Sequence, residues 1–117
     1  MARKKSYKLE PVYQADLKQT LYERYPGCIV QKEDPSEHLG IPDLLILYKD
    51  RWATLEVKIS EKAHHQPGQD RYVEQMNGMS FSRFIYPENE EEVLSELDGY
   101  FKKPKRVRRK KNAMEST

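Results

Sequence analysis

The stretch GIPDLLILYKDRWATLEVK, residues 40–58, carries the clearest structural pattern in this chain of 117 residues. Its two apolar runs, LLILY and WATLEV, are separated by the polar residues KDR, which predicts a β-hairpin. The same stretch also contains Asp43, Glu56 and Lys58. Because apolar strands rarely carry charges unless those charges are paired or bind something, these three residues call for a chemical explanation.

The hairpin register predicts where the three charges lie. A two-residue turn at Asp50–Arg51 would place Asp43 opposite Lys58, with Glu56 diagonal to Asp43 on the same face and about 7–8 Å away along the backbone. A slip by one residue would bury the charges singly, so the pattern favours a register in which they converge. The opposite face then collects only apolar side chains, namely Leu44, Ile46, Tyr48, Ala53, Leu55 and Val57.

Hydrophobic periodicity predicts the other elements and their order. A capping box at Asn89 and Glu92 is expected to open the last helix. The order α-β-β-β-α-β-α indicates an α/β fold, with one mixed sheet flanked by helices. The expected elements are a helix over Glu10–Tyr25 with Tyr13, Leu17 and Leu21 buried, strands Cys28–Gln31, Leu44–Tyr48 and Trp52–Val57, a helix from near Pro67 with Tyr72, Val73, Met76 and Met79 on one side, strand Ser82–Tyr86, and a helix with Val93, Leu94, Leu97, Tyr100 and Phe101 buried.

Charge is distributed unevenly along the chain. Residues 1–8, 9–101 and 102–117 carry net charges of +4, −9 and +7, so one acidic domain over residues 9–101 is expected between a basic N-terminal arm and a basic, disordered tail. The tail is predicted to bind phosphates, with a localisation signal or simple solubilisation as the alternative. Its basic residues are Lys102, Lys103, Lys105, Arg106, Arg108, Arg109, Lys110 and Lys111.

The cysteine content and the hydropathy of the chain indicate in which cellular compartment the protein is expected. Cys28 is the one cysteine, so an internal disulfide is excluded and a reducing environment is expected. No targeting segment is recognisable, and the longest apolar run, Leu44–Tyr48, is too short to cross a bilayer. The sequence therefore predicts a cytoplasmic or nucleoid-associated protein that is neither secreted nor bound to a membrane.

The converging charges favour a particular chemistry. Two neighbouring carboxylates repel each other, and a hard cation with oxygen ligands relieves that repulsion, which favours Mg²⁺, with Mn²⁺ as a substitute. No zinc site is expected, because Cys28 stands alone and the adjacent His64 and His65 have no partners at ligand spacing. A lysine beside such an ion can orient a water molecule, so the cluster is typical of a hydrolytic phosphodiesterase.

These residues also resemble a known family. Pro42–Asp43 followed by Glu56-Val57-Lys58 resembles the PD-(D/E)XK nuclease superfamily, and residues 9–101 are similar to its small stand-alone VRR-NUC branch. The matching features are Glu10 with Gln14 at a helix start, Gly40 to Asp43, Glu56 to Lys58, and Gln69. The resemblance implies a restriction-endonuclease-like α-β-β-β-α-β core with an extra C-terminal helix.

The resemblance also implies roles for individual residues. Asp43, Glu56 and the carbonyl of Val57 would ligate the metal, Glu10 would bind it directly or through water, and Lys58 would align the attacking water. Gln69 would complete the catalytic set.

Several assignments stay open at this level. Glu10 could be a plain first-turn glutamate, with Glu23 as its rival, and Gln66 could replace Gln69. The acid-x-lysine pattern has little weight alone, since Asp16 and Lys18 repeat it within a helix. The histidines His38, His64 and His65 are expected to be loop residues, although His64 or His65 could touch a phosphate.

The expected function is a Mg²⁺-dependent endonuclease that cuts branched DNA as a homodimer, in the manner of a Holliday-junction resolvase. One site cuts one strand, so cleavage of a four-way junction requires two copies around a two-fold axis. Two alternatives remain: a nuclease for flaps or unbranched DNA within a larger assembly, and an inactive nuclease-like fold that only binds nucleic acid.

Overall fold

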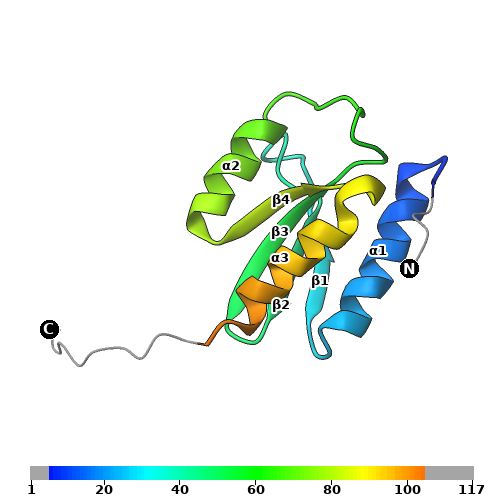
Figure 1. The fold of residues 1–117 in the computed structure, drawn as a ribbon. Helices are drawn as coiled ribbons and strands as arrows, with labels where there is room; N and C mark the ends of the chain where they lie inside the picture. Colours follow the sequence, from blue (N-terminus) through cyan, green and yellow to red (C-terminus); the bar gives the residue numbers. More distant parts are fainter. Residues whose placement is uncertain (1–5, 105–117) are drawn as a thin grey trace, which may run out of the picture.

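The computed structural model describes residues 6–104, which form three α-helices, one short 3₁₀ helix and four strands (Figure 1). Their order confirms the α-β-β-β-α-β-α prediction, and most boundaries lie within one or two residues of those expected. The elements are α1 (Glu10–Arg24), β1 (Ile29–Lys32), β2 (Leu44–Tyr48), β3 (Arg51–Val57), α2 (Gln69–Met79), β4 (Phe81–Ile85), η1 (Pro87–Asn89) and α3 (Glu90–Lys102).

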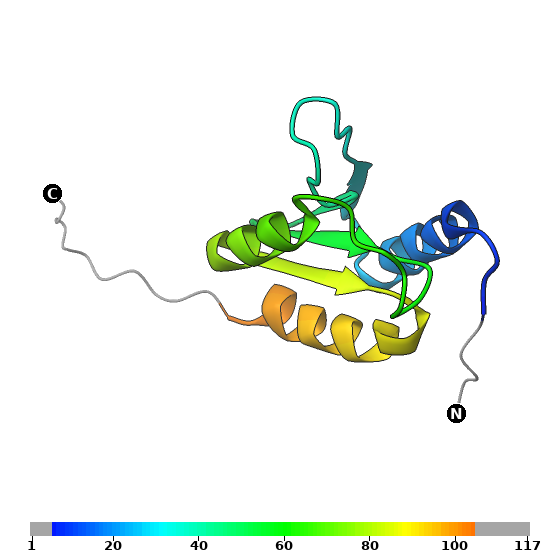
Figure 2. The same cartoon turned by 90° about the horizontal axis from the view of Figure 1, so that it is seen from above.

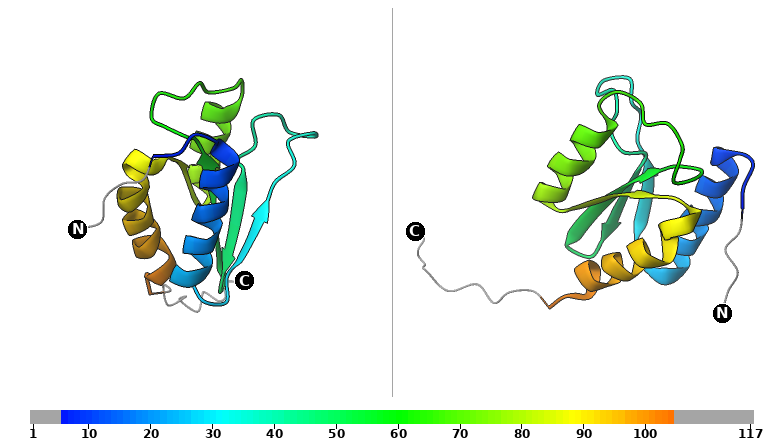
Figure 3. Two further views of the ribbon diagram at one scale, coloured as in Figure 1. Left: turned by 90° about the vertical axis from the view of Figure 1, so that its right-hand side faces the viewer. Right: turned by 45° about the horizontal axis from the view of Figure 1, so that its top comes forward.

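The four strands form one mixed sheet in the order β1-β2-β3-β4. β1–β2 and β2–β3 are antiparallel, whereas β3 and β4 are parallel, because α2 makes the crossover between them. Figure 2 shows α2 and α3 on opposite sides of the sheet. In Figure 3, α1 and α3 lie next to each other against one face. The predicted α/β fold, a mixed sheet flanked by helices, is therefore confirmed.

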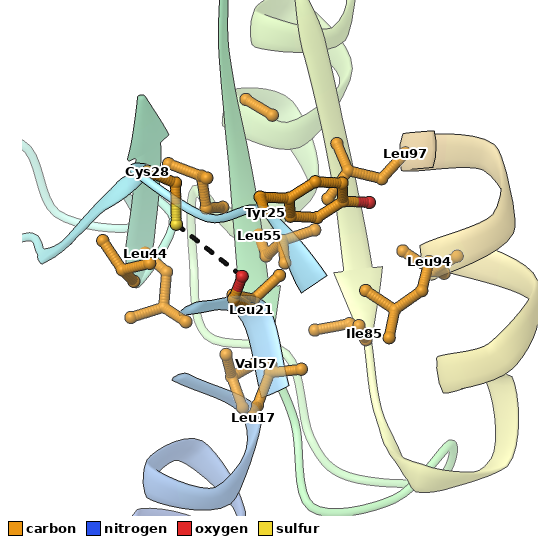
Figure 4. Close-up of a cluster of buried hydrophobic side chains, with 14 of the residues drawn as sticks. Leu17, Leu21, Tyr25, Cys28, Leu44, Leu55, Val57, Ile85, Leu94 and Leu97 are labelled. Carbon is orange, nitrogen blue, oxygen red and sulfur yellow. Dashed lines mark hydrogen bonds between the residues drawn. The ribbon is translucent and has the colours of Figure 1, made fainter. Parts of the chain in front are cut away.

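The hydrophobic core fills the space between the sheet and the pair α1 and α3 (Figure 4). The predicted apolar face of the hairpin and the predicted stripe of α1 are buried there, and Tyr48 and Tyr100 pack against the core. At this centre the Cys28 thiol donates a weak hydrogen bond to the Leu21 carbonyl, with 3.7 Å between sulfur and oxygen. The buried apolar residues are Tyr13, Leu17, Leu21, Tyr25, Cys28, Val30, Leu44, Ile46, Ala53, Leu55, Val57, Phe81, Ile85, Val93, Leu94, Leu97 and Phe101.

Polar contacts hold α1 and α3 side by side with their N-termini at the same end. Arg24 binds the Asp98 carboxylate through two nitrogens, at 2.8 and 2.6 Å, and the Tyr25 hydroxyl donates to the same carboxylate at 2.5 Å. Near the other end of the pair, the Tyr13 hydroxyl donates to Glu90 at 2.8 Å. The helix starts are therefore held at one end of the sheet, which is also the end where β3 finishes.

The predicted turn of the hairpin is wrong by one position. Tyr48 pairs with Arg51, so the turn consists of Lys49 and Asp50. Lys49 adopts a left-handed backbone with φ of 58°, the conformation that a tight two-residue hairpin turn requires. The register therefore shifts by two residues rather than one, which leaves every side chain on its expected face.

Two further expectations fail. Asn89 does not cap α3 through its side chain: its Oδ1 accepts from the Tyr86 amide at 2.8 Å, and its Nδ2 donates to the Phe84 carbonyl at 3.1 Å. The amide group is engaged by the 3₁₀ turn that precedes the helix. Met79, one of the four apolar residues that the sequence places on one side of α2, is 63% exposed at the last position of the helix, whereas Tyr72, Val73 and Met76 are half-buried.

The basic tail falls mostly outside the described residues. Within them, Lys102 ends α3 and Lys103 follows it, and both are exposed. The remaining predicted phosphate-binding residues, Lys105, Arg106, Arg108, Arg109, Lys110 and Lys111, lie beyond residue 104. Between residues 6 and 104, no helix has the length and apolar character needed to cross a bilayer.

The hairpin turn makes a first prediction. Lys49→Gly should raise the free energy of unfolding by about 0.5–1 kcal/mol, because glycine occupies the left-handed region without the clash of a Cβ. Chemical denaturation of both proteins measures this difference. Lys62→Gly, in an exposed loop and without a positive φ, is the control and should give no gain. An equal gain in both variants would show that the turn strain is not the cause.

Candidate functional site

The candidate site lies where β3 ends, beside the start of β2. The register of the hairpin places Leu44 opposite Leu55, so the next position brings Asp43 opposite Glu56. Asp43 Oδ2 accepts a hydrogen bond from the Val57 amide at 3.1 Å, which ties its carboxylate to β3. The two carboxylates are thus closer than predicted, since Asp43 faces Glu56 directly rather than diagonally.

Glu56 is a buried acid with one unpartnered oxygen. Its residue is only 1% exposed, and its Oε2 accepts a hydrogen bond from Gln69 Nε2 at 2.8 Å. Gln69 is itself held, because its Oε1 accepts from the Gln66 amide at 2.8 Å. Glu56 Oε1 is fully buried and has no hydrogen-bond partner. A buried polar atom without a partner is costly, which is typical of a functional position.

Lys58 supplies the positive charge of the site. Its residue is 5% exposed, and its Nζ lies 3.9 Å from Glu56 Oε2. The same Nζ donates to the backbone carbonyl of His64 at 2.9 Å. The ammonium is therefore held between a carboxylate and a loop carbonyl, with further N–H groups that can bind a water molecule or an anion.

The electrostatics of the site reflect crowding of negative charge. The pKa of Glu56 is raised to about 8, first by burial and second by the neighbouring Asp43 carboxylate, while the Lys58 charge opposes both effects. Burial also raises the pKa of Glu10, again assisted by Asp43 and opposed by Lys58 and Lys32. Glu10, Asp43, Glu56 and Lys58 therefore lie within electrostatic reach of one another.

The alternative glutamates and glutamines named as site candidates lie in different surroundings. Glu10 begins α1 near the site and is half-buried, whereas Glu23 lies in the last turns of α1, exposed and bonded to Gln19. Gln69 is the glutamine that reaches Glu56. Gln66 contacts Gln69 through backbone groups: its amide donates to Gln69 Oε1, and its carbonyl accepts from the Gln69 amide at 3.2 Å.

The remaining polar residues also have defined places. Gln14, one turn after Glu10, is buried. Asp16 and Lys18, which repeat the acid-x-lysine pattern, lie in the middle of α1 rather than at the end of the sheet.

Three histidines flank the site on loops, as expected. His38 Nδ1 lies 3.2 Å from the Tyr72 hydroxyl. The His65 ring stacks on Phe84, and its Nδ1 lies 2.7 Å from Asp70 Oδ1. The contribution of His64 is its carbonyl group, which no residue pattern could reveal because every residue has one.

Two glycines clamp the loops that carry the site. Gly40 and Gly68 both have positive φ, 93° and 88°, and their backbones touch: a Cβ on Gly40 would lie 2.6 Å from the carbonyl carbon of Gly68. Gly40 comes three residues before Asp43, and Gly68 comes directly before Gln69. This close approach fixes the separation between the start of β2 and the start of α2, and therefore the position of both site residues.

The fit of a metal ion can be tested on this arrangement. As the side chains stand, no three His, Cys, Asp or Glu residues between positions 6 and 104 come close enough together to form a ligand set. The donors are nevertheless those of a hard divalent cation, namely two adjacent carboxylates, one of which has a buried oxygen without a partner. Zn²⁺ is disfavoured, because the one cysteine, Cys28, is buried in the core instead.

Comparison with known proteins gave no relative: no family model, curated protein or solved structure matches the chain.

The glycine contact makes a second prediction. Gly40→Ala should lower the free energy of unfolding by about 2–4 kcal/mol, because the new methyl group meets the Gly68 backbone and the positive φ is unfavourable. The matched control is Gly27→Ala, where φ is 90° but nothing lies within 4 Å of the added Cβ, and it should cost only about 1 kcal/mol. Urea unfolding measures both. Equal losses would mean that the loop contact contributes nothing.

The buried acid makes a third prediction. Glu56 has a higher pKa in the folded protein than in the unfolded chain, so its contribution to stability is complete below about pH 4.5 and is lost as the pH rises through about 8. Glu56→Gln should therefore be near neutral at pH 5 and should stabilise the metal-free protein by about 1–3 kcal/mol at pH 9. Thermal and urea unfolding at both pH values test this.

The control for this experiment is Glu74→Gln, which replaces an exposed glutamate of α2. Its effect on the free energy of unfolding should not change between pH 5 and pH 9. If Glu56→Gln shows no more pH dependence than Glu74→Gln, the carboxylate is ionised in the fold at neutral pH.

Proposed function

We propose that this protein is a metal-dependent endonuclease that hydrolyses phosphodiester bonds in DNA, with a restriction-endonuclease-like core of the PD-(D/E)XK type. One observation carries the proposal: a buried glutamate with an unpartnered oxygen faces a second carboxylate, and an ammonium group lies beside them. A stable fold gains nothing from this cluster by itself, because burial of a carboxylate beside another negative charge is unfavourable.

The residues that would hold Mg²⁺, or Mn²⁺ in its place, are Asp43, Glu56 and the carbonyl of Val57, with Glu10 bound directly or through water. When bound, such an ion polarises the phosphodiester and lowers the pKa of water. Asp43 directly precedes β2 and Glu56 lies in the adjacent β3, so the pairing of these strands sets the spacing of the two residues. Gln69 holds one oxygen of Glu56 in place, which leaves the unpartnered Oε1 for a ligand role.

Lys58 is assigned to the attacking water. It follows β3 and is anchored by the His64 carbonyl, so its Nζ has a defined position 3.9 Å from Glu56. An ammonium group at this place can hold a water molecule by a hydrogen bond, favour its hydroxide form, and stabilise the negative charge that develops on the phosphate.

Branched DNA is the proposed substrate, cut by a homodimer in the manner of a Holliday-junction resolvase. The domain between residues 9 and 101 carries a net charge of −9, so attraction to DNA would come from bound divalent ions and from the basic arms. Two copies related by a two-fold axis would place one site on each of two opposed strands.

The nuclease proposal makes a fourth prediction. Purified protein with Mg²⁺ should cut a synthetic four-way junction, and EDTA should stop the reaction. Lys58→Ala and Asp43→Asn should each reduce the cleavage rate by about 10²–10⁴-fold while the fold remains intact by circular dichroism. Gel assays with labelled junction strands measure the rates, with a flap and a linear duplex as comparison substrates.

Lys18→Ala is the matched control, because Lys18 belongs to the acid-x-lysine pattern in α1 and should leave cleavage unchanged. Faster cutting of the flap or duplex than of the junction would favour a nuclease that acts within a larger assembly. Binding of the junction without any cleavage would point to a nucleic-acid-binding role. Wild-type cleavage by both site variants would exclude this site.

A further inference from the structure

The loop between β3 and α2 is fastened to the site at three consecutive residues. The carbonyl of His64 accepts from Lys58 Nζ at 2.9 Å, and the amide of Gln66 donates to Gln69 at 2.8 Å. Between them, the ring of His65 stacks on Phe84, with 4.2 Å between ring centroids and 15° between ring planes. Lys58 and Gln69 both contact Glu56, so residues 64–66 form a bridge over the buried acid.

His65 is the residue of this bridge that has an anchor outside the site. Phe84 belongs to β4 and is paired with Glu56 in the parallel register, so it lies on the same face of the sheet as the acid. The hydrogen bond to Asp70 is on the surface, where the Asp70 side chain is 76% exposed, and it contributes little by itself. The stacked ring pair is therefore the main contact that fixes this part of the loop backbone.

The position of the Lys58 ammonium group depends on this loop. Its Nζ has the His64 carbonyl as its one close hydrogen-bond acceptor among the described contacts, because Glu56 Oε2 is 3.9 Å away. A lysine side chain has several rotatable bonds, and the position of its ammonium depends on the acceptor that holds it. The carbonyl is held in turn by the neighbouring His65 ring, which cannot leave Phe84 without moving the peptide.

We propose that His65 is a positioning residue for Lys58: its ring, stacked on Phe84, fixes the loop so that the preceding carbonyl holds the ammonium beside Glu56. The role of Lys58 in catalysis rests on the proposed function, but its position in the fold does not. His65 needs no contact with substrate or metal for this role. The ring matters for its shape and stacking, so a phenyl group should replace it.

The first test measures the position of Lys58 without any nuclease assay. Trace acetylation of the folded protein, followed by peptide mass spectrometry, gives the reactivity of each lysine. Lys58 is 5% exposed and bound, so it should react slowly in the wild type. His65→Ala should increase its rate about fivefold or more, because the loop opens locally, while the rate at Lys18 in α1 stays the same. His65→Phe should keep the slow rate.

His38→Ala is the matched control. His38 is also a loop histidine beside the site, and it shares one hydrogen bond with the Tyr72 side chain, but it does not belong to the segment that holds Lys58. Its removal should leave Lys58 acetylation unchanged. If His65→Ala fails to fold by circular dichroism, Phe84→Leu removes the same stacking from the other side and should give the same increase.

The second test uses cleavage of the four-way junction. A displaced ammonium should lower kcat about tenfold or more with little change in KM, since small displacements of a catalytic group are costly and substrate binding is not affected. His65→Phe should restore most of kcat. Absence of cleavage by the wild type would count against the proposed function alone, because the acetylation experiment would still decide the role of His65.

The proposal is overturned if folded His65→Ala or Phe84→Leu leaves Lys58 as unreactive as in the wild type. It is also overturned if His65→Phe exposes Lys58 as much as His65→Ala does, because the stacked ring would then have no positioning effect. Slow acetylation in His65→Phe together with fast acetylation in His65→Ala supports it.

Discussion

The burial of the Glu56 carboxylate opposite Asp43 is the constraint on which the rest of the site depends. An acid with 1% exposure and one unpartnered oxygen is unfavourable, and its raised pKa expresses that cost. The cost is tolerated because the other face of the same strand is apolar around it: Leu55 and Val57 are buried in the core on either side of Glu56. β3 thus carries both apolar side chains that stabilise the domain and the buried carboxylate that destabilises it.

The surroundings of Glu56 come from parts of the chain that are distant in sequence. Asp43 arrives through hairpin pairing, and Gln69 arrives because the crossover between the parallel strands β3 and β4 returns α2 to the face that carries the acid. α1 brings Glu10 to the same end, since its parallel packing with α3 holds both helix starts there. The mixed topology of the sheet is therefore what assembles the site.

Backbone contacts, rather than side-chain chemistry, fix the loops around this acid. Gly40 and Gly68 meet with their backbones in contact, and the His64 carbonyl holds Lys58. Both contacts require one particular loop conformation. Apart from the two glycines, the loops contribute only backbone atoms to these contacts, which any residue type would supply. A site held in this way tolerates few changes of backbone while it tolerates many changes of exposed side chains.

The sequence by itself determined the order of the elements, the two faces of the hairpin, and the prediction that Asp43, Glu56 and Lys58 share one face. Side chains of a strand alternate between its two faces with a period of two residues. The predicted faces are therefore correct, even though the predicted turn is one position off and the register shifts by two residues. Only the tertiary structure decided that Asp43 faces Glu56 directly, that Gln69 rather than Gln66 reaches the acid, and that Lys58 binds a loop carbonyl. These contacts depend on backbone groups and on distances between separate elements, and side-chain periodicity carries no information about either.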